Sequence, residues 1–285
     1  MPPDALTMAE AIGTTTTLPA IGLGTRLLLG EDCARVVAQA INVGYRYIDT
    51  SPIYGNEAAV GAGIQRSGIP RQSIFVTTKV ERANLGGDDV RRSVEDSLAE
   101  LEIDTIDLLL LHWPNDETPL ADTISAMSAL QREGLLRNIG VANFPIAQLD
   151  RAIELAAGHG TVIAANQVEV HPSLYQKRLI DACQRRGVAV IAYAPTGRED
   201  IKHPKVLEIA SRLQRSPPQV VLRWHIQLGI MPVPIPDTAT YDQISRQYEI
   251  FDFHLSATDM QTLSTVTPST RYFNPAWAPK WDPLV

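Results

Sequence analysis

Short apolar runs alternate with longer amphipathic stretches along most of the chain. Residues 88–101 and 120–131 repeat apolar side chains at spacings of three and four, which is typical of helices with one buried face. The runs between such stretches have the length of strands and no helical period. About eight strands separated by helices are therefore predicted, at residues 20–24, 46–50, 73–80, 106–112, 136–141, 164–170, 188–193 and 231–234.

The expected helix boundaries carry suitable residues. Aspartates stand near three expected helix starts, where carboxylates complement free amide groups, and glycines follow three expected ends. These residues are Asp32, Asp88 and Asp122 at the starts, and Gly44, Gly134 and Gly187 at the ends. Since no linker rich in Pro, Gly or Ser divides the pattern, we predict one α/β domain over residues 1–285, a (β/α)8 TIM barrel. An N-terminal hairpin at residues 14–17 and an irregular C-terminal tail at residues 272–285 would flank it.

Charge and composition limit the partners. A net charge of -7 argues against nucleic acid or an anionic membrane surface, because these require a concentrated basic face. No apolar run approaches the ~20 residues of a membrane span, and the start of the chain, with Asp4 and Glu10, lacks the pattern of a secretory signal. The two cysteines, Cys33 and Cys183, form no CxxC motif, so reduced thiols and a cytoplasmic location are expected. A small-molecule partner fits best.

Polar side chains gather where the expected strands end. In a barrel these ends form one face, which carries the active site. Each of these residues taken alone has an ordinary structural interpretation, such as an aspartate in a turn, a solvated lysine or a histidine in the core. Together they suggest a site, composed of Asp49, Tyr54, Lys79, His112, Asn143, Gln167, Glu169 and Tyr193.

Four of these residues have the chemistry of a proton donor and its support. A tyrosine with an ordinary pKa of about 10 exchanges protons poorly near neutrality, but a nearby ammonium stabilises its phenolate. Lys79 would supply that charge to Tyr54, and Asp49 would keep the buried lysine protonated. His112 would donate a hydrogen bond to the substrate oxygen.

The motifs around these residues resemble those of the aldo-keto reductases, most closely the bacterial group that includes 2,5-diketogluconate reductases. They read GYRYIDTS at 44–51, YGNE at 54–57, VTTK at 76–79, LLLHWP at 109–114 and NQVEVHP at 166–172, within a likeness that spans residues 18–253. The resemblance implies NAD(P)H-dependent reduction of an aldehyde or ketone to the alcohol, with Tyr54 as general acid. It also implies that Asp49 and Lys79 tune this tyrosine and that His112 orients the carbonyl.

The resemblance further implies a cofactor site. Asn143 and Gln167 would hold the nicotinamide carboxamide while Tyr193 stacks on the ring, fixing one face for hydride transfer. The other expected cofactor-binding residues are Gly24, Thr25, Pro195, Thr196, Gly197, Asp237, Thr238, Gln243, Arg246 and Gln247.

Two departures from the family pattern concern the cofactor. Ala142 replaces a serine, which removes one hydroxyl contact worth roughly 0.5–1.5 kcal/mol. Asp237 stands where the family commonly has a lysine near the 2′-phosphate of NADPH. Carboxylate–phosphate repulsion reaches about 4 kcal/mol per charge pair at about 4 Å and an effective dielectric near 20, so we predict a preference for NADH. In the alternative, Asp237 points to solvent and Arg246 serves NADPH.

Substrate selection is predicted from the residues expected around the mouth. Arg26 replaces a common aromatic residue, and its guanidinium suits an anionic substrate such as a keto acid, although a rim arginine is as often only solvated. Apolar walls are expected from aromatic residues that could equally serve ordinary packing. These candidates are Trp113, Phe144, Tyr272 and Trp277.

Rival functions are less well supported by the residues. The run GLGTRL at 22–27 is similar to a dinucleotide-binding loop but lacks its third glycine. The histidines show no metal-ligand spacing, so no metal is expected. A cofactor-binding sensor or scaffold subunit with negligible turnover is the remaining alternative. The resemblance makes a monomer the default expectation.

Overall fold

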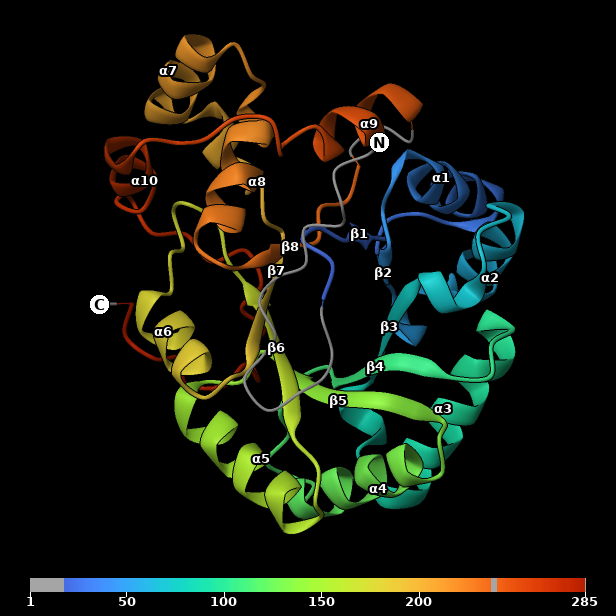
Figure 1. Cartoon of the computed structure of the whole chain (residues 1–285). Helices are drawn as coiled ribbons and strands as arrows, with labels where there is room; N and C mark the ends of the chain where they lie inside the picture. The colour runs from blue at the N-terminus through green and yellow to red at the C-terminus, as the bar shows by residue number, and fades with distance from the viewer. Residues whose placement is uncertain (1–17, 237–239, 285) are drawn as a thin grey trace.

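The computed structural model describes residues 18–236 and 240–284. Within them, eight parallel strands lie side by side in the order of the chain (Figure 1). Every strand overlaps one of the eight predicted runs, which confirms that part of the prediction. The strands are β1 (Leu23–Gly24), β2 (Tyr47–Asp49), β3 (Phe75–Val80), β4 (Ile106–Leu111), β5 (Leu136–Ala142), β6 (Ile163–Glu169), β7 (Ala189–Tyr193) and β8 (Met231–Pro232).

Backbone hydrogen bonds also join the first strand region to the last. The Gly22 N–H donates to the Pro232 carbonyl at 3.0 Å, and the Gly24 N–H donates to the Pro234 carbonyl at 2.9 Å. Neighbouring strands are paired from β1 to β8, so these bonds complete a ring. The result agrees with the predicted (β/α)8 barrel.

Helices surround the strands (Figure 1). The two helices predicted most clearly occur as α3 and α4, and Gly44 ends α1 with φ 135°, which favours glycine. The helices are α1 (Gly30–Val43), α2 (Glu57–Arg66), α3 (Gly87–Leu101), α4 (Leu120–Arg132), α5 (Ile146–Gly158), α6 (Lys177–Arg185), α7 (Pro204–Leu213), α8 (Pro217–Gln227), α9 (Tyr241–Tyr248) and α10 (Ala257–Leu263). Four single-turn 3₁₀ helices are η1 (Pro52–Tyr54), η2 (Arg71–Ser73), η3 (Arg82–Asn84) and η4 (Asp200–Lys202).

The segments that flank the barrel were also part of the prediction. Beyond α10 the chain has no further helix or strand up to residue 284, as expected for the irregular tail. The hairpin expected at residues 14–17 lies outside the described residues. Within the described part of the chain, no helix is both long and apolar enough to cross a membrane.

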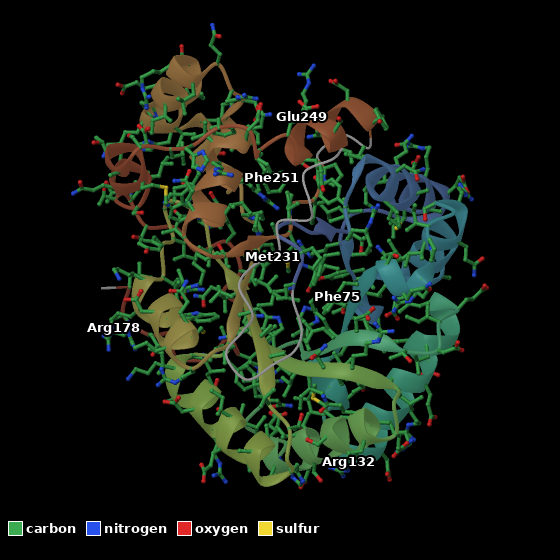
Figure 2. All side chains as sticks on the ribbon, in the orientation of Figure 1. Phe75, Arg132, Arg178, Met231, Glu249 and Phe251 are labelled. Atoms are coloured by element: carbon green, nitrogen blue, oxygen red, sulfur yellow. The ribbon has the colours of Figure 1, made fainter. Side chains whose placement is uncertain are left out.

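The core consists of layers that follow from the two-residue repeat of the strands. One set of strand side chains fills the inside of the ring, including Tyr47, Leu108 and Met231, and the alternate set packs against the helices. Figure 2 shows Phe75 and Met231 near the centre of the molecule, whereas Arg132 and Arg178 lie at its edge. Because these side chains fill the inside of the ring, a site is expected at the ends of the strands and not within the barrel.

Candidate active site

A buried ion pair lies at the carboxyl ends of β2 and β3. Lys79 Nζ is 2.7 Å from Asp49 Oδ1 and donates a second hydrogen bond to the Thr50 carbonyl at 2.9 Å. Lys79 is 1% exposed and Asp49 is 4% exposed. Burial lowers the pKa of Lys79, but Asp49 and Tyr54 more than offset that effect, so the net shift is upward. The surroundings of Lys79 therefore favour its charged form.

Tyr54 is placed beside this ammonium by the turn that follows β2. Pro52 opens the 3₁₀ turn η1, and Gly55, with φ 63°, closes it in a left-handed conformation that glycine adopts readily. Lys79 Nζ lies 5.3 Å from the centre of the Tyr54 ring and interacts with its hydroxyl. The structure thus brings together the tyrosine and lysine that the sequence separates.

The electrostatics of Tyr54 differ from the simple expectation. Burial is the largest influence and raises the pKa of the phenol, whereas the Lys79 ammonium lowers it and Asp49 raises it. The net shift is upward. Lys79 thus acts in the predicted direction but does not outweigh desolvation, and Tyr54 remains a protonated phenol at neutral pH.

His112 follows β4 and faces Tyr54 edge-on, with ring centroids 6.2 Å apart and planes at 84°. Its Nδ1 lies 3.4 Å from the Ser51 hydroxyl, and its carbonyl accepts a hydrogen bond from Asn143 Nδ2 at 3.0 Å. Burial, Lys79 and Arg26 together lower the pKa of His112 to about 3. The ring is therefore neutral near pH 7, and Nε2 carries the proton if Nδ1 accepts from Ser51.

Amide side chains and a tyrosine from β5, β6 and β7 adjoin this group. Gln167 Nε2 donates to the second oxygen of Asp49 at 2.6 Å. The Tyr193 hydroxyl donates to Asn143 Oδ1 at 2.8 Å, and Asn143 itself has a positive φ of 65°. Positive φ is uncommon outside glycine and is tolerated best by Asn and Asp. The residues predicted to hold the nicotinamide therefore lie directly beside Asp49 and His112.

The remaining candidates for cofactor binding lie on three segments. Gly24 ends β1 and Thr25 follows it, and the Thr25 hydroxyl donates to the Asp49 carbonyl at 2.9 Å. Pro195, Thr196 and Gly197 follow β7, and Gly197 has φ 53°. Gln243, Arg246 and Gln247 lie on α9. Asp237 and Thr238 lie outside the described residues.

Two side chains of α9, Arg246 and Gln247, differ in whether their polar groups have a partner in the protein. Arg246 pairs with Asp242 at 2.9 Å, one turn away on the same helix, and both side chains are exposed. Gln247 is 5% exposed, and its Oε1 has no hydrogen-bond partner among the described residues. A buried acceptor without a partner is costly and is suited to receive a donor from a ligand.

Aromatic residues of the C-terminal tail cover one side of the group. Trp277 packs edge-on against Trp113 with ring centroids 5.1 Å apart, and Trp281 contacts the same ring at 6.0 Å. Phe273 packs edge-on against Tyr193 at 5.5 Å. Tyr272 instead packs on His171 at 4.9 Å. The predicted walls Trp113 and Trp277 therefore contact each other directly.

Arg26 and Arg82 each stack on one of these tail aromatics, and Arg271 stacks on Trp281. The guanidinium of Arg26 lies 4.9 Å from the centre of the Phe273 ring, and that of Arg82 lies 5.1 Å from the Trp277 ring. Arg26 is exposed, and its charge lowers the pKa of both Tyr54 and His112. Within residues 18–236 and 240–284, neither Arg26 nor Arg82 has a carboxylate in ion-pair contact.

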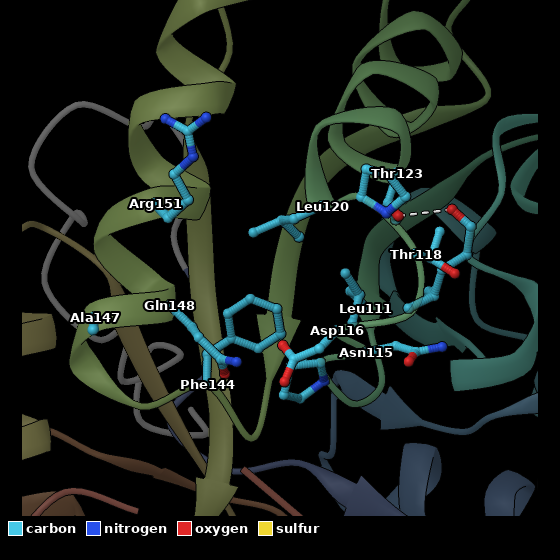
Figure 3. Close-up of a pocket in the computed structure, with 13 residues that line it drawn as sticks. Leu111, Asn115, Asp116, Thr118, Leu120, Thr123, Phe144, Ala147, Gln148 and Arg151 are labelled. Carbon is cyan, nitrogen blue, oxygen red and sulfur yellow. Dashed lines mark hydrogen bonds between the residues drawn. The ribbon is translucent and has the colours of Figure 1, made fainter. Parts of the chain in front are cut away.

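Phe144 occupies a different place from the other predicted walls. It is fully buried and lines a cavity of about 360 Å³ between the loop after β4 and the first turns of α4 and α5 (Figure 3). Leu120, Gln148 and Arg151 line the same cavity. Its proposed contact with substrate stays a prediction.

Sequence reasoning did not identify several residues around the group. Ser51 and Arg82 each lie within three residues of a strand end, so their position was a usable signal. Phe273 and Trp281 are in the irregular tail, whose path over the barrel has no periodic signature. Only tertiary structure brings them to the site.

Comparisons with known proteins agree with this arrangement. The model of the Aldo/keto reductase family matches residues 20–267. An aldo-keto reductase of Mycolicibacterium smegmatis is 37% identical over 90% of this chain and 95% of its own length. Methylglyoxal reductase DkgB of Yersinia pestis is 37% identical over 93% of this chain and 100% of its own length. A crystal structure described provisionally as a 2,5-diketo-D-gluconic acid reductase B has a TM-score of 0.89 and 38% identity, covering 93% of this chain and 94% of that one.

Proposed function

The chain belongs to the aldo/keto reductase family, whose members reduce carbonyl groups with a nicotinamide cofactor, and we propose that Tyr54 is its proton donor. The observation that carries this assignment is the contact between Tyr54 and the buried Lys79–Asp49 pair. In the proposed reaction the carbonyl carbon receives a hydride and the carbonyl oxygen receives the phenolic proton of Tyr54. The product is an alcohol, and a phenolate is left on the enzyme.

The choice of Tyr54 over His112 as the acid follows from their protonation states. A pKa of about 3 leaves His112 without a second proton near neutrality. The raised pKa of Tyr54 keeps its proton in place until a substrate oxygen with developing negative charge accepts it. His112 then has the role of a neutral hydrogen-bond donor that orients the carbonyl.

Lys79 and Asp49 act on the state that follows proton transfer. The Tyr54 phenolate would form beside a lysine ammonium in a site of low dielectric, where attraction between opposite charges is strong. Asp49 holds that ammonium in position through the 2.7 Å contact. The pair therefore lowers the free energy of the charged product state relative to the neutral phenol.

The described residues fit a dinucleotide cofactor, which when bound supplies the hydride. Among the described residues, the buried Gln247 Oε1 has no hydrogen-bond partner and is available to a donor group of the cofactor. Gly24 and Gly197 would contribute backbone groups. Asn143 and Gln167 would hold the nicotinamide carboxamide, and Tyr193 would pack on the ring. Thr25, Pro195, Thr196 and Gln243 complete the proposed contacts.

We further propose that NADH is preferred over NADPH. The carboxylate of Asp237 would repel a 2′-phosphate, and Arg246, the cation that could attract one, is paired with Asp242. The proposed preference for NADH therefore rests on Asp237 in the sequence and on the ion pair of Arg246 with Asp242 in the structure.

An anionic carbonyl compound is the proposed substrate class. Arg26 is close enough to Tyr54 and His112 to influence both pKa values, and it has no carboxylate partner in the described part of the chain. A guanidinium in that state suits a carboxylate on the substrate. Monomeric state, cytoplasmic location and a single domain over residues 1–285 remain predictions.

The function is tested by following nicotinamide absorbance with a panel of aldehydes and ketones for the native protein and Tyr54→Phe. We expect turnover in the native protein and a loss of about 10²–10⁴-fold in the variant, with cofactor affinity retained. Cofactor binding without turnover of any compound would instead favour the sensor or scaffold alternative. Turnover unaffected by the substitution would overturn the assignment of Tyr54.

A further inference from the structure

A second buried ionic group lies outside the proposed proton-donor site. Glu169 ends β6, His171 follows two residues later, and Asp200 begins η4 after the segment that carries Pro195–Gly197. Glu169 and His171 are 0% exposed, and Asp200 is 3% exposed. The proposed reaction uses none of them, so their burial requires another explanation.

Both nitrogens of the His171 ring face carboxylate oxygens. Nε2 lies 3.0 Å from Glu169 Oε1, and Nδ1 lies 2.6 Å from Asp200 Oδ2. Nδ1 also makes a hydrogen bond with the Ser173 hydroxyl at 3.1 Å, whereas Asp200 Oδ2 has no hydrogen bond among the described residues. Asp200 therefore acts on the ring through its charge, and Glu169 acts through both its charge and a hydrogen bond. Burial lowers the pKa of His171, but the two carboxylates raise it further, and the net shift is upward. The two carboxylates on either side of His171 therefore favour its cationic form.

Glu169 connects His171 to the C-terminal tail. The backbone N–H of Tyr272 donates to Glu169 Oε1 at 2.7 Å, and that of Phe273 donates to Oε2 at 3.0 Å. Phe273 in turn contacts Tyr193 and carries the stacked guanidinium of Arg26. Glu169 therefore anchors the backbone of the tail at two consecutive amides, beside other contacts such as that of Arg271 with Gln176.

Asp200 connects His171 to the proposed cofactor segment. A Cβ atom built on Gly197 would overlap Asp200 Oδ2, so this carboxylate packs directly against the Gly197 backbone. Asp200 Oδ1 also accepts the Ser173 N–H at 3.2 Å. Asp200, which belongs to the ionic group that contacts the tail, thus also restricts the conformation of residues 197–200.

We propose that Glu169, His171 and Asp200 are positioning residues that couple cofactor binding to the stability of the C-terminal tail in its position beside the substrate. This inference rests on the cofactor role proposed for Pro195–Gly197. When the cofactor orders that segment, it also fixes Asp200, and through His171 it stabilises the hydrogen bonds from the Tyr272 and Phe273 amides to Glu169. By reciprocity, loosening the tail weakens cofactor binding to the same extent.

The test measures the stability of the tail and the affinity for cofactor in two variants of the full chain, Asp200→Asn and Glu169→Gln. Hydrogen exchange of the Tyr272 and Phe273 amides reports on the tail, and quenching of tryptophan fluorescence by NADH or NADPH gives the cofactor Kd. We expect Asp200→Asn to accelerate exchange at both amides at least tenfold without cofactor, although it touches neither amide. Glu169→Gln should raise the cofactor Kd at least threefold and the KM of the carbonyl substrate similarly, with kcat changed less than threefold.

Two controls separate coupling from a general loss of structure. Tyr272→Phe removes the direct bond between the Tyr272 hydroxyl and the Glu199 N–H, at 3.2 Å, while leaving the ionic group intact. Asp259→Asn removes a buried carboxylate that contacts Ser256 and Arg212 away from the barrel mouth. Both should leave the exchange rates and the cofactor Kd within twofold of the native values.

The native protein gives an independent measurement if the variants do not fold. Saturation with cofactor, verified by fluorescence, should slow exchange of the Tyr272 and Phe273 amides at least threefold. Unchanged exchange in the saturated protein would overturn the coupling while leaving the proposed reaction intact. Absence of any cofactor binding would contradict the proposed function instead.

Discussion

Lys79 Nζ and Asp49 Oδ1 lie 2.7 Å apart, and both side chains are almost wholly buried. Such a pair is tolerated only because each charge satisfies the other and because the Thr50 carbonyl and the Gln167 amide occupy the remaining positions. The stability and the chemistry of the site are therefore linked.

Removing either charge should destabilise the protein and abolish most activity. Lys79→Met and Asp49→Asn should each cost about 3–5 kcal/mol of unfolding free energy, because a buried charge is left unpaired. The double variant should cost clearly less than the sum, as chemical denaturation would show. Arg151→Met, which breaks an exposed pair with Glu154, is the control, with a change within about 0.5 kcal/mol. Strict additivity of the two buried substitutions would contradict the pairing.

The pH dependence of the two reaction directions should differ. The raised pKa of Tyr54 keeps the phenol protonated, so kcat/KM for reduction should stay level from neutral pH up to the ordinary tyrosine value of about 10. Oxidation of the alcohol requires the phenolate and should accelerate as pH rises. Because the pKa of His112 is about 3, no inflection should occur near 6.5. An inflection there that disappears in His112→Gln would contradict the neutral histidine.

Cofactor choice should respond to charge near α9. In the native protein, kcat/KM should be higher with NADH, and Asp237→Lys should move the ratio toward NADPH because an attraction replaces a repulsion. Asp242→Ala should move it in the same direction by releasing Arg246 from its ion pair. Steady-state kinetics with both cofactors provide the measurement. A strong native preference for NADPH would refute the proposal.

Arg26 should control discrimination between charged and neutral substrates. Arg26→Ala should lower kcat/KM for keto acids by about tenfold or more, since a charge-assisted hydrogen bond is worth about 1.5–3 kcal/mol. Matched neutral ketones should be affected much less. Arg151→Ala, which removes an arginine from the cavity that Phe144 lines, serves as the comparison. An equal loss for both substrate classes would count against an anionic substrate.

The sequence predicted those features that depend on local pattern. Strand positions followed from apolar runs, and placing Asp49, Lys79 and His112 at one face required only that parallel strands end together. The net direction of the Tyr54 pKa was not accessible, because it depends on how completely the folded chain removes water from the phenol. The tail was equally inaccessible, since Phe273 and Trp281 reach the site through contacts that no periodicity encodes. Asp237 and Thr238 remain predictions from sequence.

The closure of the barrel between Gly22–Gly24 and Pro232–Pro234 has a consequence for its hydrogen bonding. Proline has no N–H, so at this seam the last strand offers acceptors where an ordinary strand would also offer donors. The hydrogen bonds of the seam therefore run in one direction only, from glycine N–H groups to proline carbonyls, and a substitution of either proline would add a donor that the opposite strand could accept.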